Sequence, residues 1–567
     1  MVLTSAYFLI GMAQNSLILL GMTPKSKVIL LGAILLIVVG FKQADDYFEI
    51  SKNLELFGAV YKTVNAEYVD EVNPGDLMKK GIDAMLSSLD PYTNYYNESQ
   101  AEEAILRQKG EYGGIGCRSQ KIDQFTCITE VFKGMPADKA GLRVGDKIIE
   151  VNGRKFIGNI DEEIGDQLKG APGSKVNIVV DRSGKTLAFD VLREEIKIKN
   201  VPYFGMINDQ TAYIKLDQFM IGSAAEIKQA LIQLKSKGAQ NLVLDLRDNG
   251  GGLLHEAVNI VNLFVPMDEM VVISKGRSKD AYKEYKTLDA PVDTKMPLIV
   301  LVNERSASAS EIVCGSIQDL DRGLVVGRNT FGKGLVQNVL PLAYRNQMKV
   351  TIAKYYIPSG RCIQLLDYGH KDKNGKATIL PDSLRKAFKT KNGRTVYDGG
   401  GVRPDFVVKN DNTPSILTQL FKGHLIYKFA NEYRNNHEQI STAQDFSIQA
   451  DDYARFKAFV SENMHALKGT ADVQLDLFQK ALKEEAYTTE SEANTKQLIQ
   501  SLETIKLNEL EVHKTKIIAA INLEITRRYY YDDADYLTAF KHDADLLKTI
   551  ELFAQPNVFQ TQLKGQK

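Results

Sequence analysis

Three serines alternate with alanines in the stretch "NERSASASEIV", residues 303–313. Ser306, Ser308 and Ser310 follow an apolar run that predicts a strand and precede a pattern that predicts a helix. A serine at such a corner can be a nucleophile if a base takes its proton and backbone N–H groups stabilise the oxyanion. The next histidine is His370, 60 residues beyond Ser310. The base for such a serine therefore has to be found elsewhere in the sequence.

The same stretch has a structural interpretation. Ser308 and Glu311 have the spacing of a capping box, in which the serine hydroxyl accepts a hydrogen bond from an unpaired N–H group of the first helical turn. Taken alone, this pattern favours a helix cap over a nucleophile.

A run of glycines in "DNGGGLL", residues 248–254, predicts a second strand-to-helix corner. Glycines let a backbone approach a substrate closely and present N–H groups to it. Together with the N–H of Ala309 they could form an oxyanion hole for acyl transfer. A plain tight turn is the alternative.

Lys333 lies between two glycines in "NTFGKGLVQ", residues 329–337. A lysine on such a turn usually points to water. Burial beside Ser308 would instead lower its pKa and leave a neutral amine that can act as a base. In that case no histidine is needed.

The elements around these corners predict an α/β core, because strand–turn–helix units repeat between residues 197 and 410. Ligands of such sheets bind at the carboxyl ends of the strands. Residues 45–110 and 411–567 have mostly helical patterns, with a helix over 76–89 and a turn at 89–96.

The region 111–196 has the pattern of a β-rich module. "YGGIG" begins a strand, "AGLRVGDKIIEVNG" follows, and a hairpin is expected around Ser183 and Gly184. These motifs resemble a PDZ domain. In such domains a Gly-x-Gly loop, here Gly114, Ile115 and Gly116, offers N–H groups to a peptide's terminal carboxylate.

Seven motifs in this order resemble the carboxy-terminal processing (tail-specific) proteases, which are Ser–Lys serine peptidases with an inserted PDZ domain. The resemblance covers roughly residues 50–410. The motifs are "YGGIG", "AGLRVGDKIIEVNG", "DLRDNGGGLLHEAV", "RSASASEIV", "TFGKGLVQ", "YYIPSGRCIQ" and "GGGVRPD". Each is weak alone, and their order and spacing are specific. The resemblance implies a multidomain α/β protein with a crotonase/ClpP-like catalytic core and a PDZ domain.

The resemblance also implies residue roles. Ser308 would be the nucleophile of an acyl-enzyme mechanism, and Lys333, 25 residues downstream, its base. Gln337 would orient the lysine. The backbone N–H groups of Ala309, Gly251 and Gly252 would bind the oxyanion. Asp319 matches an acidic position of some members and ranks as supporting only.

Two rival hypotheses remain open. One is a Ser–His–Asp triad that uses His255, which follows the glycines. The other is a non-enzymatic PDZ scaffold or ligand-binding relative. Intact Ser308, Lys333 and Gln337 argue against the second.

Charge and composition bound the partners. Lys+Arg and Asp+Glu both number 71, so the balance gives no electrostatic argument for nucleic acid. The cysteines show no zinc-like spacing, and we expect neither metal nor cofactor. Protein substrates with exposed C-termini are the expected partners, and self-association as a homo-oligomer stays open.

The N-terminus predicts export. Lys25 and Lys27 precede the apolar run "VILLGAILLIVVGF", residues 28–41. This order is typical of an export signal or a short membrane anchor. The lack of a clear A-x-A site favours an uncleaved anchor over a removed peptide, and Met22 is an alternative start. Either interpretation predicts a periplasmic, extracytoplasmic protein.

The expected domains follow from these patterns. They are a signal or anchor segment (1–44), an N-terminal helical region (45–110), a PDZ domain (111–196), a catalytic domain (197–410) and a helical C-terminal extension (411–567).

Two further features have uncertain roles. Cys117 and Cys127 would face each other across a hairpin centred near residue 122, close enough for a disulfide, although two separate thiols remain the favoured interpretation. Cys314 and Cys362 are expected in the core. The basic insertion at 365–401 could form a flap.

Overall fold

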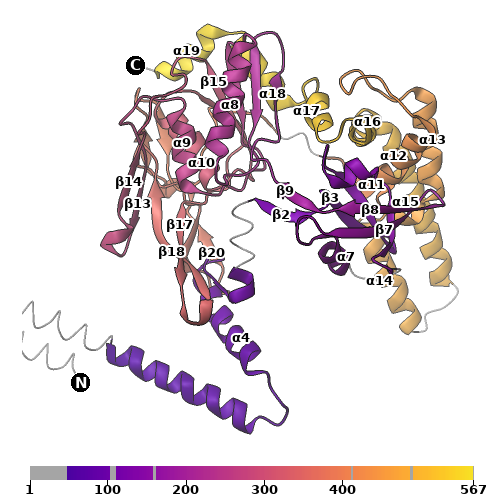
Figure 1. Cartoon of the computed structure of the whole chain (residues 1–567), viewed down its shortest axis with the longest axis horizontal. Helices are drawn as coiled ribbons and strands as arrows, with labels where there is room; N and C mark the ends of the chain where they lie inside the picture. The colour runs from indigo at the N-terminus through magenta and orange to yellow at the C-terminus, as the bar shows by residue number, and fades with distance from the viewer. Residues whose placement is uncertain (1–46, 102–109, 157–160, 410–412, 486–489, 566–567) are drawn as a thin grey trace, which may run out of the picture. The chain divides into compact units, whose positions relative to one another are not determined.

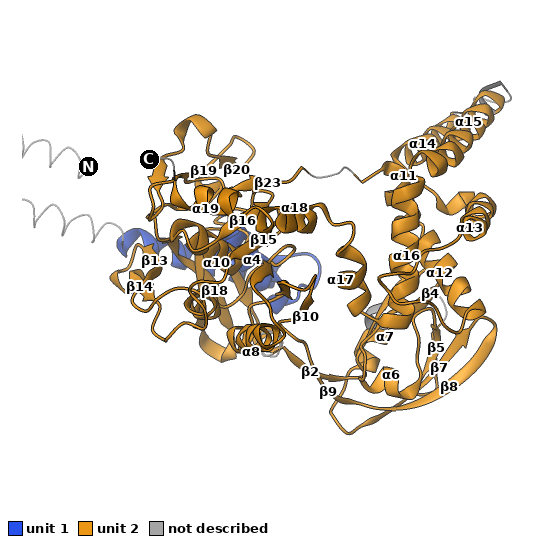
Figure 2. Cartoon of the chain, turned by 90° about the horizontal axis from the view of Figure 1, so that it is seen from above, with its two compact units in different colours: residues 1–88 blue, residues 89–567 orange. Residues whose placement is uncertain are grey.

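The computed structural model describes residues 47–101, 110–156, 161–409, 413–485 and 490–565. The chain divides into two compact units, Met1–Ser88 and Leu89–Lys567, which Figure 2 colours separately. Among the described residues, no helix is both long and apolar enough to cross a membrane. The predicted anchor at 28–41 lies outside the described residues.

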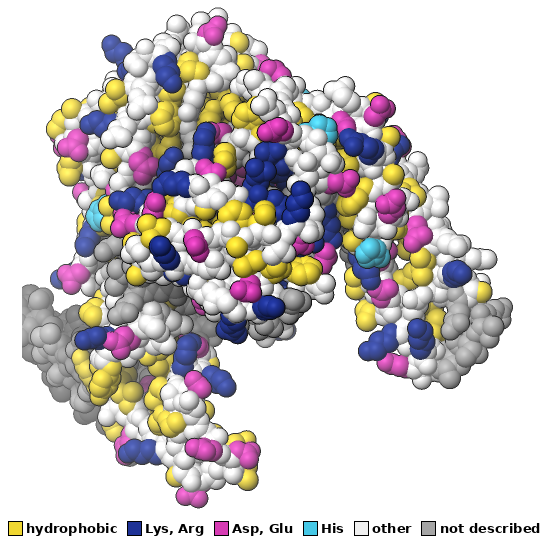
Figure 3. Space-filling model, turned by 45° about the vertical axis from the view of Figure 1, so that its right-hand side comes forward, with side chains coloured by type: hydrophobic (Ala, Val, Ile, Leu, Met, Phe, Trp, Pro, Cys, Tyr) yellow, Lys and Arg dark blue, Asp and Glu magenta, His cyan; other side chains and the backbone are white. Residues whose placement is uncertain are grey.

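The described part of the first unit is helical, as predicted for this part of the chain. Residues 47–67 form one helix, and α4 (Pro74–Ser87) confirms the helix predicted at 76–89. Asn73 caps α4, since its side chain accepts hydrogen bonds from the N–H groups of Gly75 (2.9 Å) and Asp76 (3.2 Å). Hydrophobic side chains are exposed along the first helix: Tyr47, Phe48, Ile50, Leu54, Leu56 and Phe57. Figure 3 shows the hydrophobic side chains on one face of the whole molecule in yellow.

The module between residues 111 and 196 has the predicted β-rich fold. Its sheet has the order β3-β4-β5-β7-β8, with β6 paired to β5, so β3 is an edge strand of the described sheet. Helix α7 (Asp161–Leu168) packs against β3. The strands are β3 (Cys117–Ile122), β4 (Phe125–Val131), β5 (Lys147–Val151), β6 (Arg154–Lys155), β7 (Lys175–Arg182) and β8 (Lys185–Leu192). The expected hairpin turns at Ser183 and Gly184, both with positive φ.

Short segments connect and complete this module. β2 (Glu111–Gly114) pairs with β9 (Glu194–Lys197) in antiparallel register. The chain therefore enters and leaves the module through two paired strands. Helix α6 (Pro136–Ala140) packs on β8 and ends at Gly141, whose φ of 87° is readily adopted only by glycine.

The hairpin carrying Cys117 and Cys127 corrects the predicted geometry. Its turn is at Asp123 and Gln124, because Ile122 pairs with Phe125, and a register shift follows. Cys117 therefore lies opposite Val131 and Cys127 opposite Gln120. The two cysteines therefore do not face each other, and neither is in a disulfide. Cys314 is free and buried, and Cys362 is free and half-buried.

A six-stranded sheet forms the centre of the α/β region, with the order β10-β11-β12-β15-β16-β23. All pairs are parallel except β10–β11. The strands are β10 (Tyr203–Met206), β11 (Thr211–Lys215), β12 (Asn241–Asp245), β15 (Leu298–Val302), β16 (Leu324–Gly327) and β23 (Phe406–Val407). Strand β15 is buried along its whole length, as parallel strands covered on both faces are.

Different parts of the chain cover the two faces of this sheet. Helices α8 (Ser223–Ser236), α9 (Leu254–Asn262) and α10 (Ala309–Asp319) pack on one face in a large apolar core (Figure 1). The other face packs against side chains from the end of the chain: Phe540, Leu546, Leu552 and Phe559.

A second, antiparallel sheet has the order β1-β18-β13-β14, with β17 paired to β18. The predicted turn at 89–96 ends in its strand β1 (Asn94–Tyr96). The other strands are β13 (Met270–Gly276), β14 (Lys283–Lys286), β17 (Leu335–Pro341) and β18 (Gln347–Tyr356). Lys333 lies two residues before β17, and Gln337 lies within it, so this sheet positions two of the predicted site residues.

The predicted insertion at 365–401 consists of two small hairpins. β19 (Leu366–Lys371) pairs with β20 (Ala377–Ile379), and β21 (Ala387–Lys389) pairs with β22 (Thr395–Tyr397).

The C-terminal region is helical, as predicted. A first group of helices shares one apolar core: α11 (Ser415–Lys422), α12 (Leu425–Asn436), α13 (Ala450–Glu462), α15 (Glu490–Val512) and α16 (Lys514–Tyr530). Helix α14 (Thr470–Glu484) packs on α15. The last helices are α17 (Asp533–Ala539), α18 (Ala544–Phe553) and α19 (Pro556–Lys564), of which α18 and α19 pack on β16 of the central sheet.

Candidate active site

Ser308 lies between β15 and α10 in a strained backbone conformation, with φ 57° and ψ −112°. A residue other than glycine in such a region costs on the order of 1–3 kcal/mol, and this strain is concentrated at functional sites. The hydroxyl of Ser308 makes no capping hydrogen bond. Its position and its unused hydroxyl are those expected of a reactive serine.

The two neighbouring serines are structural. The Ser306 hydroxyl donates to the Leu246 carbonyl oxygen (2.8 Å) and accepts from the Asn303 N–H (2.9 Å). The Ser310 hydroxyl donates to the Asn249 carbonyl oxygen (2.9 Å). Both side chains are fully buried. Their hydroxyls therefore join the serine corner (residues 303–308) to the glycine corner (residues 248–252).

Only half of the predicted capping box forms. The Glu311 carboxylate accepts from the Ser308 N–H at 2.8 Å. The Glu311 N–H, however, donates to the Ser308 backbone oxygen at 2.9 Å instead of the hydroxyl. The positive φ of Ser308 thus keeps its side chain out of the cap.

Glu311 also organises the loop that carries Lys333. Its carboxylate accepts from the Lys333 N–H (2.9 Å), the Gly332 N–H (2.7 Å) and the Thr330 hydroxyl (2.6 Å). The side chain is fully buried. Burial raises the pKa of Glu311, and these donors oppose that shift by stabilising the carboxylate. One buried carboxylate therefore joins the backbones of Ser308 and Lys333.

Lys333 is half-buried, and its Nζ lies 4.2 Å from the centroid of the Tyr92 ring. Burial, reinforced by the charge of Lys349, lowers the pKa of Lys333 to about 8 against the opposing carboxylates of Glu311 and Asp90. The Tyr355 hydroxyl lies 2.7 Å from the Lys333 carbonyl oxygen and 3.1 Å from that of Ser308. No hydrogen bond joins the Lys333 amine to the Ser308 hydroxyl within the described part of the chain.

Tyr92 was not predicted as part of the site. Its turn is ordered by Asp90, whose carboxylate accepts from the N–H groups of Tyr92 (2.8 Å) and Thr93 (3.0 Å). The ring meets that of Tyr368 edge to face, at 6.2 Å and 87°. Tyr368 belongs to the 365–401 insertion, so the insertion supports the aromatic ring beside Lys333.

Two other predicted residues make contacts elsewhere. The Gln337 amide donates to the Thr351 hydroxyl at 3.2 Å, and not to Lys333. Asp319, at the end of α10, forms a buried ion pair with Arg361 at 2.8 Å. Its position is therefore structural.

The glycine corner touches the serine corner. A Cβ on Gly251, whose φ is 95°, would lie 2.6 Å from the Ala307 carbonyl oxygen and 2.9 Å from the Ala309 nitrogen. A Cβ on Gly252 would lie 2.4 Å from the Phe219 carbonyl oxygen. The packing therefore requires glycine at both positions.

The backbone N–H groups of Gly251, Gly252 and Ala309 differ in whether they already have a hydrogen-bond partner. The Gly251 N–H donates to Asn249 Oδ1 at 2.8 Å. The N–H groups of Gly252 and Ala309 have no hydrogen-bond partner among the residues the structure describes. Both groups can therefore donate a hydrogen bond to a ligand. Asn249 itself, missed in the sequence, is fixed by its amide donating to the Leu216 carbonyl oxygen (2.8 Å).

The rival Ser–His–Asp triad would use His255 as its base. His255 is exposed in the first turn of α9 and meets the ring of Tyr285 at 5.7 Å. Within the described residues no hydrogen bond joins it to Ser308. No cluster of side chains suited to a metal ion occurs among those residues either.

Comparison with known proteins identifies the family of this chain. A model of peptidase family S41 matches residues 210–368. The "Carboxy-terminal-processing protease" of Bartonella bacilliformis is 32% identical over 387 residues, which cover 65% of this chain and 88% of the relative. The chain belongs to this family. It is a carboxy-terminal-processing serine peptidase.

Further matches extend the family assignment along the chain. A PDZ domain model matches residues 127–182, and a model described as "Probable PDZ-protease, C-terminal helical domain" matches 416–553. A "Probable CtpA-like serine protease" of Staphylococcus aureus (strain MRSA252) is 34% identical over 320 residues, covering 55% of this chain and 62% of the relative.

Among solved structures, the photosystem II D1 C-terminal processing protease is 28% identical with a TM-score of 0.32, covering 58% of this chain and 91% of the other. The PDZ domain of the Vibrio cholerae carboxy-terminal protease, solved with a peptide, is 29% identical with a TM-score of 0.15. The match covers 16% of this chain and 99% of the other.

The loop of Gly114, Ile115 and Gly116, predicted to bind a terminal carboxylate, has two N–H groups to consider. The Ile115 carbonyl oxygen accepts from the Ala137 N–H (2.7 Å), and the Gly116 carbonyl oxygen accepts from the Phe132 N–H (3.0 Å). The N–H groups of Ile115 and Gly116 have no partner in the described part of the protease. A Cβ on Gly116 would lie 2.4 Å from the Met135 Cβ, so the loop requires glycine there.

Proposed function

We propose that this protease cleaves proteins with a Ser308–Lys333 dyad through an acyl-enzyme. The observation that carries the proposal is the strained Ser308, whose hydroxyl is uncommitted and whose corner meets two unpaired N–H groups. Lys333 supports it, because its pKa of about 8 leaves a useful neutral fraction near physiological pH. Their backbones are joined by Glu311.

The proposed reaction begins when the Lys333 amine leaves the Tyr92 ring and approaches Ser308. The Ser308 oxygen attacks the peptide carbonyl carbon, and its proton passes to the neutral amine. The N–H groups of Gly252 and Ala309 donate to the oxyanion. Gln337, after leaving Thr351, would orient the amine.

The intermediate then collapses. The C–N bond breaks, and Lys333 returns the proton to the leaving amine, which gives an ester on Ser308. Water attacks the ester carbonyl while Lys333 accepts a proton from that water. The ester bond breaks, and the proton returns to the Ser308 oxygen.

We further propose that the PDZ domain captures the substrate's C-terminus. The free N–H groups of Ile115 and Gly116 would bind the terminal carboxylate, and the tail would pair with the edge strand β3 beside α7. Peptides that end in a free carboxylate should bind more tightly than the same peptides with a terminal amide. Equal affinities would contradict tail capture.

The decisive experiment compares wild type with Ser308→Ala on an unfolded protein that has an apolar C-terminus. Cleavage should require Ser308, as should covalent labelling by a fluorophosphonate. His255→Ala should keep most of the activity. If wild type cleaves no more than Ser308→Ala across several substrates and pH values, the dyad proposal fails and the scaffold alternative gains support.

We also propose that residues 28–41 export or anchor the protein, so that its folded domains act in the periplasm. The support is the order of the two lysines and the apolar run. The predicted domain boundaries and self-association remain proposals as well. Fractionation of cells and protease accessibility of a C-terminal tag would test the location, and retention of the tag in the cytoplasm would contradict it.

A further inference from the structure

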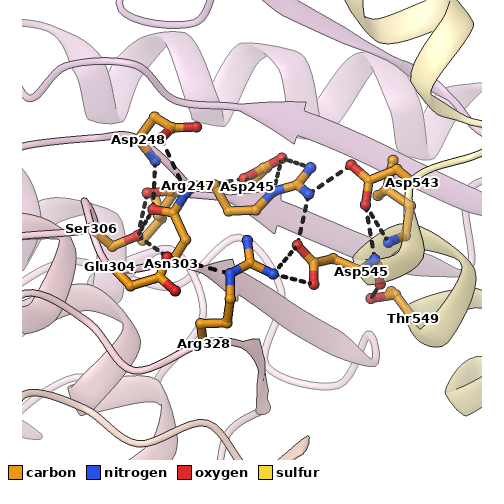
Figure 4. A network of polar contacts seen from close by, with 12 residues as sticks. Asp245, Arg247, Asp248, Asn303, Glu304, Ser306, Arg328, Asp543, Asp545 and Thr549 are labelled. Carbon is orange, nitrogen blue, oxygen red and sulfur yellow. Dashed lines mark hydrogen bonds and ion pairs between the residues drawn. The ribbon is translucent and has the colours of Figure 1, made fainter. Parts of the chain in front are cut away.

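Two arginines at the ends of central strands bind carboxylates from helix α18 (Figure 4). Arg247 Nη1 donates to Asp543 Oδ2 (2.6 Å) and to Asp545 Oδ2 (2.9 Å). Arg328 Nη1 donates to Asp545 Oδ1 (3.0 Å). The Asp545 side chain is only 4% exposed, so one buried carboxylate bridges two guanidinium groups.

The strands that end at these arginines all lead to the active site. Arg247 follows β12 and precedes Gly251 by four residues, and Arg328 follows β16 and precedes Lys333 by five. Strand β15 lies between them in the sheet and leads to Ser308. Its end joins the network too, because Arg328 Nε donates to Glu304 at 3.4 Å. The network therefore spans three adjacent strand ends.

Helix α18 is oriented so that it presents these carboxylates. Asp543 caps the helix by accepting from the N–H groups of Asp545 (2.9 Å) and Leu546 (3.1 Å). Leu546 and Leu552 are buried against the central sheet. The apolar face and the cap together fix where the carboxylates lie.

The carboxylates also balance buried charge. Burial disfavours the charge of Arg247, but Asp245 and Asp543 outweigh it and hold the Arg247 pKa well above its usual range. Asp245 binds Arg247 from the same strand at 2.6 Å. Without Asp543 and Asp545, Arg247 would keep only its pair with Asp245, and Arg328 would keep only its long contact to Glu304. The arginines would then repel each other across the strand ends.

Displacement of Arg247 would reach the glycine corner directly. The next residue, Asp248, donates its N–H to Asn303 Oδ1 (3.0 Å) and accepts from the Asn303 amide (3.1 Å). Asn303 begins the serine corner. The bonds between Asp248 and Asn303 thus link the glycine corner to the serine corner, and Asp248 is the residue next to Arg247.

We propose that Asp543 and Asp545 are positioning residues for peptide hydrolysis. They hold Arg247 and Arg328, and through them the strand ends that lead to Gly252, Ser308 and Lys333. Neither aspartate touches the substrate. The C-terminal helix thereby completes the catalytic domain. This inference rests on the proposed roles of Ser308 and Lys333.

The test uses the full chain with Asp545→Asn and with the double variant Asp543→Asn/Asp545→Asn. The matched control is Asp535→Asn, which removes a carboxylate that pairs with Arg527 at 2.6 Å in α17 and lies outside the network. The measurements are the rate of Ser308 labelling by a small fluorophosphonate, kcat and KM for a peptide, and the melting temperature.

We expect labelling and kcat to fall about 10- to 100-fold in the double variant, because small displacements of reacting groups have effects of this size. KM should change less than about twofold, as expected for an effect on the reacting groups rather than on substrate binding. The control should stay within about twofold of wild type in all rates.

A double variant that is folded at the assay temperature but labels and cleaves within twofold of wild type would overturn the inference. A rate loss that only matches the loss of folded protein would overturn it as well. If the double variant does not fold, Arg328→Lys decides, since it keeps the charge and removes the planar fork. A folded Arg328→Lys with unchanged labelling contradicts the inference, and slowed labelling supports it. Labelling that survives Ser308→Ala would instead contradict the dyad itself.

Discussion

Two half-buried cations on either side of the serine corner are held in opposite ways. Arg247 is paired with three carboxylates, those of Asp245, Asp543 and Asp545. The Lys333 amine lies over the ring of Tyr92 and has no ion-pair partner within the described residues. Arg247 therefore stays charged, whereas the lowered pKa of Lys333 lets its amine lose the proton.

The comparison of Arg247 with Lys333 shows that burial alone does not decide whether a basic side chain stays charged. Burial opposes the charge of both side chains. Carboxylate partners reverse its effect at Arg247, and a neighbouring cation, Lys349, adds to it at Lys333. The same α/β framework thus contains an arginine held charged by carboxylates and a lysine with a lowered pKa, which is the proposed base.

The largest effect is expected from removal of the titratable cation. Lys333→Met should lower kcat/KM by about 10²- to 10⁴-fold, the usual contribution of a general base. Fluorophosphonate labelling should slow in parallel, while melting should change little. Lys333→Arg is the matched control for size and charge, and it should be equally inactive because its guanidinium stays protonated. Activity of either variant near wild type would remove Lys333 as the base.

The pH dependence should show the same contrast. The Lys333 pKa is lowered to about 8, and the neutral amine is the active form, so kcat/KM should rise with pH and level off above about pH 9. The rate at pH 6 should be about 100-fold below the plateau. Measurement of kcat/KM from pH 5 to 10 tests this, and a flat profile would contradict it.

Glu311→Gln tests the carboxylate that joins the two halves of the site. The amide cannot accept from all four donors, so we expect about 2 kcal/mol lower stability and roughly 10-fold lower kcat. Loss of a negative charge should also lower the Lys333 pKa, which shifts the pH midpoint downward.

The control for this variant is Glu256→Gln. The Glu256 carboxylate also accepts several donors, including the Ala224 N–H at 2.9 Å, but it caps α8. It should lose stability without a shift of the pH midpoint. An upward shift in Glu311→Gln would contradict the proposed electrostatics.

The smallest effect is expected at Lys349, whose charge helps to lower the Lys333 pKa. Lys349→Met should raise that pKa and lower the rate at pH 7 by about two- to threefold, with the plateau at high pH unchanged. Lys354→Met, an exposed lysine on the same strand, should leave the profile unchanged. An identical pH midpoint in wild type and Lys349→Met would show that this charge does not reach the amine.

Much of the site could be predicted because its chemistry is local. The three glycines, the Ser-x-x-Glu spacing and the Gly-Lys-Gly turn each define a backbone geometry within a few residues. The parallel strands then bring their ends to one edge of the sheet. Ser308, Gly251, Gly252 and Lys333 were therefore predicted near one another, and the structure places their backbones together.

The contacts that could not be predicted join distant parts of the chain. Tyr92 lies more than 200 residues before Lys333, and Asp545 nearly 300 after Arg247. The predicted pairing of Cys117 with Cys127 was wrong for a more local reason. A turn displaced by about one residue changes every cross-strand pair of the hairpin. No pattern in the sequence encodes these pairings.

The sequence by itself determined the family, the order of the domains and the residue types at the corners, because these depend on short motifs and periodicity. Only the tertiary structure decided which groups surround each charge. It gave Arg247 three carboxylates, left Lys333 against an aromatic ring and covered the open sheet face with the last helices. Burial and electrostatic partners depend on what is near in space, and those neighbours set whether a cation stays charged or becomes a base.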